Sequence, residues 1–241
     1  MKPTECPCRY IVAFDIDGTL VDLSGASSRA LREAMRNVLG GGVDQFDLAF
    51  AGMTDRGIVL DVLSQLRQTK PHTTDQGDNE RLYQTVIARY LQLLPQAMAQ
   101  RPYRPTVGAR QLLRHLATLP DLRLGLATGN VEAAAWLKLR SVGLDQFFTF
   151  GAFGDVTARR DSLVRQALNL AHNHCSGPRP ASFVVGDTPA DIQAALAAGA
   201  AAVAVATGPY SMDALSAAGP TWLFPDLRAA AQQSFWLSPC K

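Results

Sequence analysis

The sequence predicts an α/β protein whose core is a Rossmann-like parallel sheet, with an α-helical cap domain inserted into it. Two observations lead to this prediction. From residue 111 onward, short apolar segments alternate with helical segments, which is typical of a parallel sheet covered on both faces. Between residues 30 and 94, three helical patterns follow one another without a strand between them. We therefore assign residues 1–20 and 104–241 to the core and residues 21–103 to the cap.

The first predicted strand covers residues 10–14, which are apolar or aromatic and lead directly into Asp15 and Asp17. Gly18 and Thr19 then end the apolar run. A buried strand of this kind presents its carboxyl end to a crevice, which is where open α/β sheets bind ligands. The alternative is an acidic turn with no function beyond ending the strand.

The predicted cap helices each place apolar residues on one face at helical spacing. The first carries Ala30, Leu31, Ala34, Met35 and Val38; the second, after Asp55, carries Ile58, Val59, Val62, Leu63 and Leu66; the third carries Tyr83, Ile87, Tyr90, Leu91 and Leu94. Residues 69–79 are polar, with Pro71 and Gly77, and predict a loop. Pro95, Pro102, Pro105 and Gly108 mark the return to the core, so residues 20–25 and 95–108 would form two hinges.

The rest of the chain supplies the other elements of the predicted sheet. The expected strands are residues 122–127, 147–150, 183–185, 202–205 and, more weakly, 222–224. The expected helices begin at residue 111 and then cover residues 131–140, 161–171, 189–198 and 226–233.

The composition of the chain indicates which kinds of binding partner to expect. The hydrophobic content is 47%, the charged content 18% and the formal net charge +2, which fit a soluble globular protein without a nucleic-acid partner. The longest apolar stretch, residues 194–206, is shorter than the roughly 18 residues of a membrane span. The four cysteines, Cys6, Cys8, Cys175 and Cys240, form no disulfide pattern, and we expect free thiols in a cytoplasmic protein. The group His172, His174 and Cys175 is interpreted as a helix end and a loop, because no second metal-binding cluster accompanies it.

The second strand end, at residues 122–127, leads into Thr128, Gly129 and Asn130 before a helix. Unpaired backbone N–H groups and the helix dipole favour a negative charge there, and a hydroxyl adds a further donor. Thr128 or Asn130 could instead cap the helix, and the two roles can coexist.

The third strand end runs into Gly186-Asp187-Thr188-Pro189-Ala190-Asp191. Thr188 suits the N-cap, Pro189 the first helical position and Asp191 the reciprocal partner of a capping box. Asp187 is not needed by the helix and is the better metal ligand. If the strand ends are adjacent, Asp15, Asp17 and Asp187 converge. Each ionised pair would cost about 4 kcal/mol at about 4 Å and an effective dielectric near 20, which a hard divalent cation such as Mg²⁺ would offset.

These three motifs, in this order, resemble the haloacid dehalogenase-like hydrolase superfamily in its phosphatase branch. With a helical insert directly after the first motif, the chain is most similar to phosphoglycolate phosphatase-like members with a helical cap. The resemblance implies that Asp15 is the nucleophile and that Asp17 is the general acid and base. It also implies that Asp15, Asp187 and the backbone carbonyl of Asp17 hold Mg²⁺, with Thr128, Gly129 and Asn130 around the phosphate.

The sequence departs from the family pattern at one position. The family usually has a lysine before the helix that precedes the last acidic motif, where this chain has Arg159 and Arg160. We take Arg160 as the phosphate-binding cation and Arg159 as the alternative, although both could be solvated residues beside a helix start. Lys138 lies well inside a predicted helix and is expected on the surface.

A segment of the predicted cap resembles the loop that related caps lower over the active site. It contains Thr54, Asp55 and Arg56, and Arg56 could meet a substrate anion or simply belong to the first helical turn. The function implied is a Mg²⁺-dependent phosphatase of a small phosphorylated metabolite, acting through an aspartyl-phosphate. The alternatives are a β-phosphoglucomutase-like phosphomutase and, in another class, a non-catalytic binding protein on the same fold. No nucleic-acid or membrane partner is expected, and the sequence does not indicate an oligomeric state.

Overall fold

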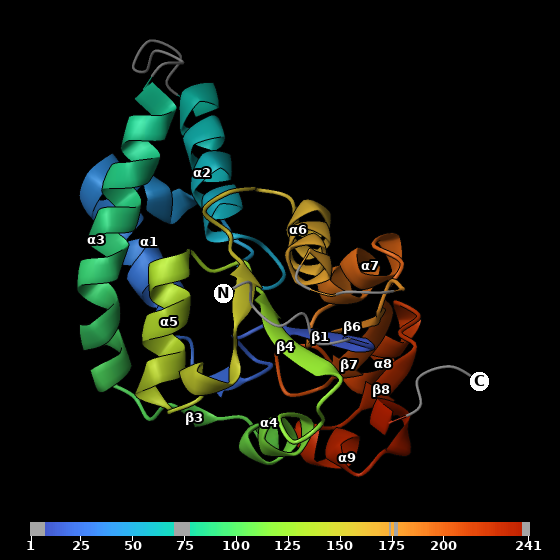
Figure 1. Cartoon of the computed structure of the whole chain (residues 1–241). Coiled ribbons are helices and arrows are strands. Elements are labelled where there is room, and N and C mark those ends of the chain that lie inside the picture. The colour runs from blue at the N-terminus through green and yellow to red at the C-terminus, as the bar shows by residue number, and fades with distance from the viewer. Residues whose placement is uncertain (1–7, 70–77, 174, 176–177, 238–241) are drawn as a thin grey trace, which may run out of the picture.

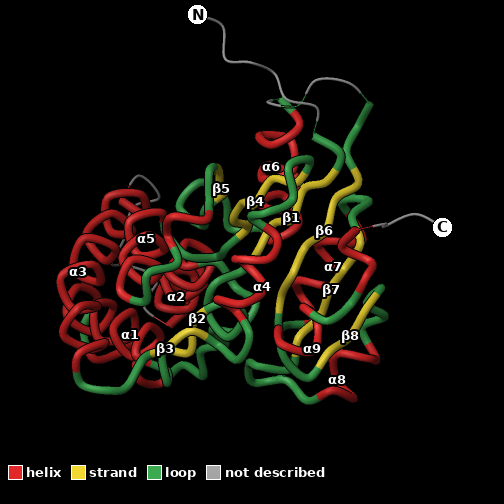
Figure 2. Tube along the Cα trace, turned by 60° about the horizontal axis from the view of Figure 1, so that its bottom comes forward, coloured by secondary structure: helices red, strands yellow, loops and turns green. Residues whose placement is uncertain are grey.

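The computed structural model of the chain describes residues 8–69, 78–173, 175 and 178–237. Six parallel strands form one sheet in the order β5-β4-β1-β6-β7-β8 (Figure 1). Their bounds are β1 Tyr10–Phe14, β4 Leu122–Ala127, β5 Phe150–Ala152, β6 Ala181–Gly186, β7 Ala201–Val205 and β8 Trp222–Phe224. Strand β1 lies between β4 and β6 and pairs with both along its whole length, as Figure 2 shows.

The two faces of the sheet are buried under different helices because alternate residues of each strand point to opposite sides. Ile11 and Ala13 of β1 face the side covered by α6 (Arg160–His172) and α7 (Pro189–Ala197) and share one buried cluster with residues of both helices. Val12 and Phe14 face the opposite side, toward α4 (Ala109–Leu116), α5 (Glu132–Ser141) and α9 (Leu227–Ala231). The predicted α/β fold with a parallel sheet is therefore confirmed.

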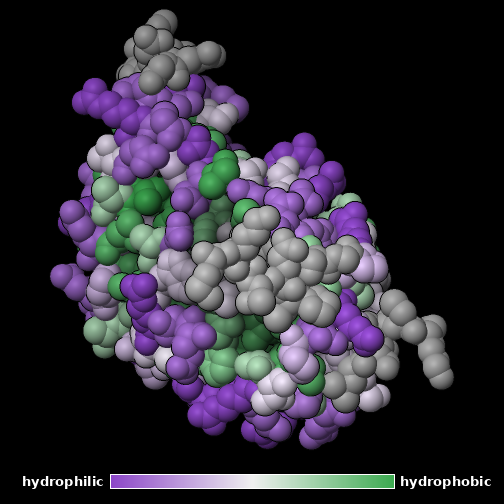
Figure 3. Space-filling view, viewed as in Figure 1, coloured by the Kyte–Doolittle hydropathy of each residue, from purple (hydrophilic) through white to green (hydrophobic). Residues whose placement is uncertain are grey.

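A helical insert, residues 23–103, separates β1 and its short extension from the rest of the sheet. Its described elements are α1 (Ala26–Leu39), the 3₁₀ turn η1 (Gly41–Gln45), α2 (Asp55–Thr69) and α3 (Asn79–Ala99). Helices α1 and α3 pack along each other, and Tyr83, Tyr90 and Leu31 are fully buried. Hydrophilic residues cover the far ends of α2 and α3 in the space-filling view (Figure 3), while hydrophobic residues show nearer the junction with the sheet.

The two connections to the insert lie side by side. Strands β2 (Val21–Asp22) and β3 (Arg104–Pro105) pair antiparallel, so the chain enters and leaves the insert through one two-stranded ribbon (Figure 2). This is the arrangement that a pair of hinges needs. The division into a core of residues 1–20 and 104–241 and a cap of residues 21–103 stays a prediction.

Some sequence-based boundaries were wrong. The strand expected at residues 147–150 begins at Phe150, because Asp145–Phe147 forms a 3₁₀ turn and Phe148 turns into the core against Phe14, with ring centroids 6.1 Å apart. Helix α3 continues past Pro95 to Ala99, since the buried residues Leu94 and Met98 on either side hold the last turn in place. The six-residue helix α8 (Met212–Ala217) and the ribbon β2–β3 were not predicted.

Several sequence-based expectations about the loop after α2 and about the cysteines and histidines fall wholly or partly outside the described residues. Most of the predicted loop 69–79 falls outside the described residues, as do Cys6, His174 and Cys240. Cys8 and Cys175 are free thiols, and His172 Nε2 lies 3.3 Å from the Ser182 hydroxyl. No described helix combines the length and the apolar character that a membrane crossing requires.

Candidate active site

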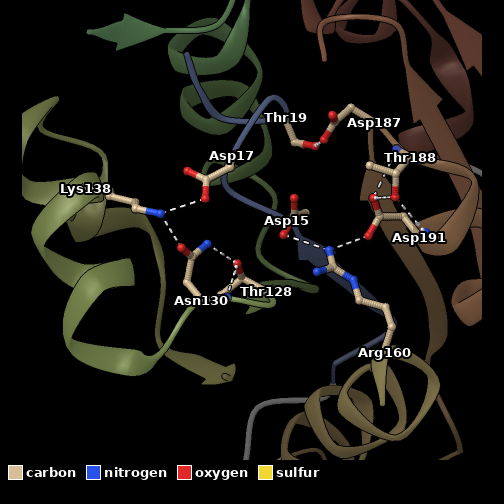
Figure 4. Close-up of polar contacts among 10 residues, drawn as sticks. All are labelled: Asp15, Asp17, Thr19, Thr128, Asn130, Lys138, Arg160, Asp187, Thr188 and Asp191. Carbon is tan, nitrogen blue, oxygen red and sulfur yellow. Dashed lines mark hydrogen bonds and ion pairs between the residues drawn. The ribbon is translucent and has the colours of Figure 1, made fainter. Parts of the chain in front are cut away.

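The carboxyl ends of β1, β4 and β6 bring the three sequence motifs together at one edge of the sheet. Asp15 directly follows β1, Thr128 follows β4 and Asp187 follows β6. Because β1 is flanked by β4 and β6, these side chains surround a common space, as Figure 4 shows. The expectation that the motifs are adjacent in one sheet is thus met.

A cavity of about 500 Å³ lies between this edge and the helical insert. Residues from both parts form its walls. The core contributes Asp15, Asp17, Gly129, Asn130, Arg160 and Asp187, and the insert contributes Leu31, Phe50, Met53, Asp55 and Ile58 among others. A space of this size suits a small-molecule ligand that is enclosed by both parts.

Asp15 is held by an arginine at the start of α6. The Arg160 Nη2 atom lies 2.8 Å from Asp15 Oδ1 and also donates to Asp191 Oδ1. Burial raises the pKa of Asp15 to about 6, although the charge of Arg160 opposes this shift. Arg159, by contrast, is exposed and pairs with Asp161 at 2.9 Å. Of the two arginines considered from the sequence, Arg160 is the one that reaches Asp15.

Asp187 is enclosed by polar and backbone groups. Its Oδ1 atom accepts a 2.6 Å hydrogen bond from the Thr19 hydroxyl. A methyl group added at Gly208 would approach Asp187 Oδ2 to 1.7 Å, so this position requires glycine. Burial first, then the charges of Asp15 and Asp191, raises the pKa of Asp187 well above its usual range.

Asp191 has the helix-capping role that the sequence predicts. The Thr188 hydroxyl accepts from the Asp191 N–H at 3.2 Å, and Asp191 Oδ2 accepts from the Thr188 N–H at 3.1 Å. The second carboxylate oxygen of Asp191 is left for Arg160 (Figure 4). Asp191 therefore fixes the guanidinium that contacts Asp15.

The segment after β4 forms a polar turn beside Asp15. The Thr128 hydroxyl is fully buried and accepts from the Asn130 side-chain amide at 2.7 Å, which leaves its own proton free to be donated. Gly129 and Asn130 line the cavity. A side chain at Gly129 would come within 2.2 Å of the Met53 carbonyl, so glycine permits the close approach of the insert.

The expectation that Lys138 lies on the surface was wrong. Its side chain has no exposed surface, and its ammonium lies 2.6 Å from Asp17 Oδ2 and 2.7 Å from the Ser27 hydroxyl. It also donates to Asn130 Oδ1. Its helical spacing could have revealed this burial. Lys138 follows Ala134 by four residues and Ala135 by three and precedes Leu139, so it lies on the buried face of α5. Burial would lower the pKa of Lys138, but the charges of Asp17, Tyr90 and Asp55 and the hydrogen bond to Asp17 together raise it above its usual value, which keeps the group protonated.

Asp17 and Asp15 therefore have different partners although they are one residue apart. Asp15 faces Arg160, whereas Asp17 points toward Lys138 on the other side of the strand end (Figure 4). Asp17 Oδ1 is inaccessible to solvent and has no hydrogen-bond partner within the described part of the chain. One oxygen of Asp17 is thus fixed by Lys138 while the other is uncommitted.

The predicted cap loop contacts the core through Asp55 rather than Arg56. Asp55 donates its backbone N–H to the Gly129 carbonyl at 2.7 Å, and its carboxylate accepts from the Val131 N–H at 2.9 Å. Burial raises the pKa of Asp55 to about 6. Thr54 is buried and accepts from the Gly57 N–H at 3.0 Å, as a helix N-cap does. Arg56 instead pairs with Glu80 at 2.5 Å and lies over the Tyr83 ring, so it belongs to the insert's own packing.

The carboxylates beside the cavity are suited to a hard cation. Asp15, Asp187 and Asp191 are buried and offer oxygen atoms within 4.8 Å of one another, with Arg160 as the neighbouring cation. Three carboxylates and one guanidinium leave an excess of negative charge, and oxygen donors are those that Mg²⁺ prefers. Burial is the largest cause of the raised pKa values of Asp15 and Asp187, and the charges of the neighbouring carboxylates add to it.

Comparisons with known proteins agree with this architecture. The sequence model of a hydrolase family, described as haloacid dehalogenase-like hydrolase, matches residues 11–199. "Probable phosphatase IndB" of Dickeya dadantii is 29% identical over 87% of this chain and 86% of its own length. A phosphoglycolate phosphatase of Agrobacterium fabrum is 26% identical over 85% of this chain and 84% of its own length.

A solved structure is similar in fold. A hydrolase from Pseudomonas syringae superimposes with a TM-score of 0.66 at 21% identity, covering 92% of this chain and 95% of its own. The family match spans β1 to the end of α7 and so includes all three motifs around the cavity. This chain belongs to the haloacid dehalogenase-like hydrolases.

Proposed function

We propose that this phosphatase hydrolyses a small phosphate monoester in a Mg²⁺-dependent reaction, with Asp15 as the nucleophile. The observation that carries the proposal is the position of Asp15, which is buried at the floor of the cavity with its carboxylate against Arg160. A guanidinium can contact both a carboxylate and phosphoryl oxygens, so Arg160 would hold the phosphate in line with Asp15.

In the first step, Asp15 attacks phosphorus and the bond to the leaving oxygen breaks. Asp17 donates a proton to that oxygen, so the alcohol leaves neutral and Asp15 carries the phosphoryl group. Water then attacks the aspartyl-phosphate, Asp17 takes a proton from it, and inorganic phosphate is released. The separate partners of Asp15 and Asp17 support this division, because Asp15 lies against Arg160 whereas Asp17 lies against Lys138 and has no described hydrogen-bond partner at Oδ1.

The metal would be held by Asp15, Asp187 and the backbone carbonyl of Asp17, with Asp191 in the same acidic group. When bound, Mg²⁺ supplies positive charge that offsets these carboxylates and the phosphoryl oxygens. Thr19 orients Asp187 through its hydroxyl, and Asp191 orients Arg160. The Thr128 hydroxyl and the turn at Gly129 and Asn130 would complete the phosphate site.

The helical insert would act as the cap that shields the reaction from bulk water. Its loop contacts the turn after β4 through Asp55, and residues on both sides line the cavity. Enclosure would strengthen the charge interactions around the phosphate.

The proposal is tested by comparing the wild-type protein with Asp15→Asn and Asp121→Asn in p-nitrophenyl phosphate hydrolysis with added Mg²⁺. Asp121 is a matched control, because it lies at the opposite ends of the strands and pairs only loosely with Arg9, at 3.7 Å. We expect Asp15→Asn to lower kcat by roughly 10⁴-fold or more and Asp121→Asn to leave it near wild type. Wild-type activity in Asp15→Asn would refute the assignment of the nucleophile.

A second measurement distinguishes hydrolysis from phosphoryl transfer to a sugar. Incubation with hexose phosphates should give free phosphate and no isomerised sugar phosphate. Rapid quenching during turnover should also place a phosphoryl group on the peptide that contains Asp15, and its absence under conditions of burst kinetics would argue against the covalent route.

A further inference from the structure

We propose that the cavity selects phosphate monoesters of neutral, partly apolar, hydroxyl-bearing alcohols and rejects esters whose alcohol carries a carboxylate. This inference rests on the proposed function and concerns the part of the same cavity that would receive the leaving group.

The walls of the cavity are already in contact with each other in this structure. The Asp55 N–H donates to the Gly129 carbonyl at 2.7 Å, which links the insert directly to the turn after β4. A second close approach is at Gly52 of the insert. A methyl group added there would lie only 2.8 Å from the Ala190 side chain of the core. The residues that line the cavity are therefore those that an enclosed substrate meets.

The insert's side of the cavity combines apolar surface with hydroxyl groups. Leu31, Phe50 and Ile58 supply apolar side chains, and Ser24 and Ser28 lie beside them. Each of these two serines donates its proton to a backbone carbonyl, Ser24 to Pro102 at 3.3 Å and Ser28 to Gly25 at 3.1 Å. While these hydrogen bonds are kept, the serine oxygens can accept from a substrate hydroxyl but cannot donate to a carboxylate.

The charges around the cavity also disfavour a substrate that carries a carboxylate. Among the described residues that line it, Arg160 is the only lysine, arginine or histidine, and it is bound by Asp15 and Asp191. Five aspartates share that lining: Asp15, Asp17, Asp22, Asp55 and Asp187. Once the phosphate and the metal are in place, a second anionic group on the substrate would find like charges without a cation to receive it.

The nearby arginines of the insert lie outside the cavity lining and have other partners. Arg56 pairs with Glu80 at 2.5 Å, and Arg29 donates to the Ser24 carbonyl at 3.0 Å. Arg32 lies over the Phe50 ring, 5.6 Å from its centroid, and donates to the Phe46 carbonyl. These side chains are not part of the cavity lining.

The test compares two esters that differ in one group, 2-hydroxyethyl phosphate and phosphoglycolate. Both are measured as substrates of the wild-type protein with Mg²⁺ and as competitive inhibitors of p-nitrophenyl phosphate hydrolysis. We expect the hydroxyl ester to have the higher kcat/KM and the lower inhibition constant, by roughly tenfold or more. Equal values, or a preference for phosphoglycolate while p-nitrophenyl phosphate is still hydrolysed, would overturn this inference and leave the proposed function standing. Failure to hydrolyse any of the three esters would overturn both.

A pair of variants locates the selectivity. Ser28→Lys places an ammonium at the insert's side of the cavity, and Ser28→Gln adds comparable bulk without charge. We expect Ser28→Lys to raise kcat/KM for phosphoglycolate relative to 2-hydroxyethyl phosphate by roughly fivefold or more, and Ser28→Gln to keep the wild-type order of preference. The same shift in both variants would show that bulk rather than charge controls the choice, which would overturn the electrostatic basis of the inference.

Discussion

The ammonium group of Lys138 lies 2.6 Å from Asp17 Oδ2, and the lysine side chain is fully buried while that of Asp17 is 39% exposed. The contact crosses from α5 to the loop after β1, and it also involves Ser27 at the start of the insert. A buried charge that reaches a proposed catalytic carboxylate fixes the orientation of that carboxylate. Lys138 is therefore expected to position Asp17 rather than to contact the substrate.

Replacing Lys138 by methionine should impair the protonation of the leaving group. We expect kcat/KM to fall more for an alkyl phosphate, whose alkoxide needs a proton, than for p-nitrophenyl phosphate, whose phenolate leaves readily. The difference should be roughly tenfold or more. The comparison requires only steady-state kinetics with the two esters at saturating Mg²⁺.

A double-mutant cycle provides the control for that prediction. In an Asp17→Asn background, Lys138→Met should cause little further loss of alkyl phosphate hydrolysis, because the group that it positions is already gone. In the wild-type background, Lys138→Met should cost about 2 kcal/mol or less of unfolding free energy, since the Asp17 carboxylate that it leaves unpaired is partly exposed to water. Equal losses for both esters in the single variant would indicate a purely structural role.

The same substitution at the two neighbouring arginines, Arg159 and Arg160, should affect kcat very differently. Arg160→Met removes the guanidinium shared by Asp15 and Asp191 and should lower kcat by roughly 10²-fold or more. Arg159→Met removes an exposed pair with Asp161 and should change both kcat and the unfolding free energy little. Activity assays and urea unfolding of the two variants check this, and comparable activity losses in both would contradict the assignment to Arg160.

The sheet and its acidic edge could be predicted from the sequence because the relevant signals are local. Strand β4 has the predicted bounds, and the capping box of Thr188 and Asp191 follows directly from residue order. The motif residues also meet as predicted, since parallel strands present their carboxyl ends at the same edge. Lys138 could not be placed in this way, because its role depends on the packing of α5 against residues about 120 positions earlier in the chain. Arg56 illustrates the same limit, since its partner Glu80 lies on another helix.

Removal of the metal should abolish activity, and its binding should stabilise the fold. In the wild-type protein, Mg²⁺ should raise Tm above the value in EDTA, because a ligand that binds only the folded state adds RT ln(1 + [L]/Kd) to the stability. Asp187→Asn should remove most of this increase while keeping an acceptor for the Thr19 hydroxyl. Asp121→Asn serves as the control and should show the wild-type increase. An unchanged Mg²⁺ effect in Asp187→Asn would exclude Asp187 as a ligand.

The burial of Asp55 should make stability depend on pH in a predictable direction. Burial raises the pKa of Asp55 from 3.8 to about 6, so between these values the folded state binds a proton that the unfolded state has lost. The free energy of unfolding therefore falls as the pH rises from about 4 to about 6. Asp55→Asn keeps an oxygen acceptor for the Val131 N–H but cannot ionise. The variant should become more stable relative to wild type across this window, by up to about 3 kcal/mol. Urea unfolding of both proteins in EDTA at several pH values measures the difference between their free energies of unfolding. The contributions of Asp15 and Asp187 largely cancel in this difference, because both proteins contain them. A difference that stays constant between pH 4 and 7 would show that Asp55 ionises in the folded protein as it does in the unfolded chain.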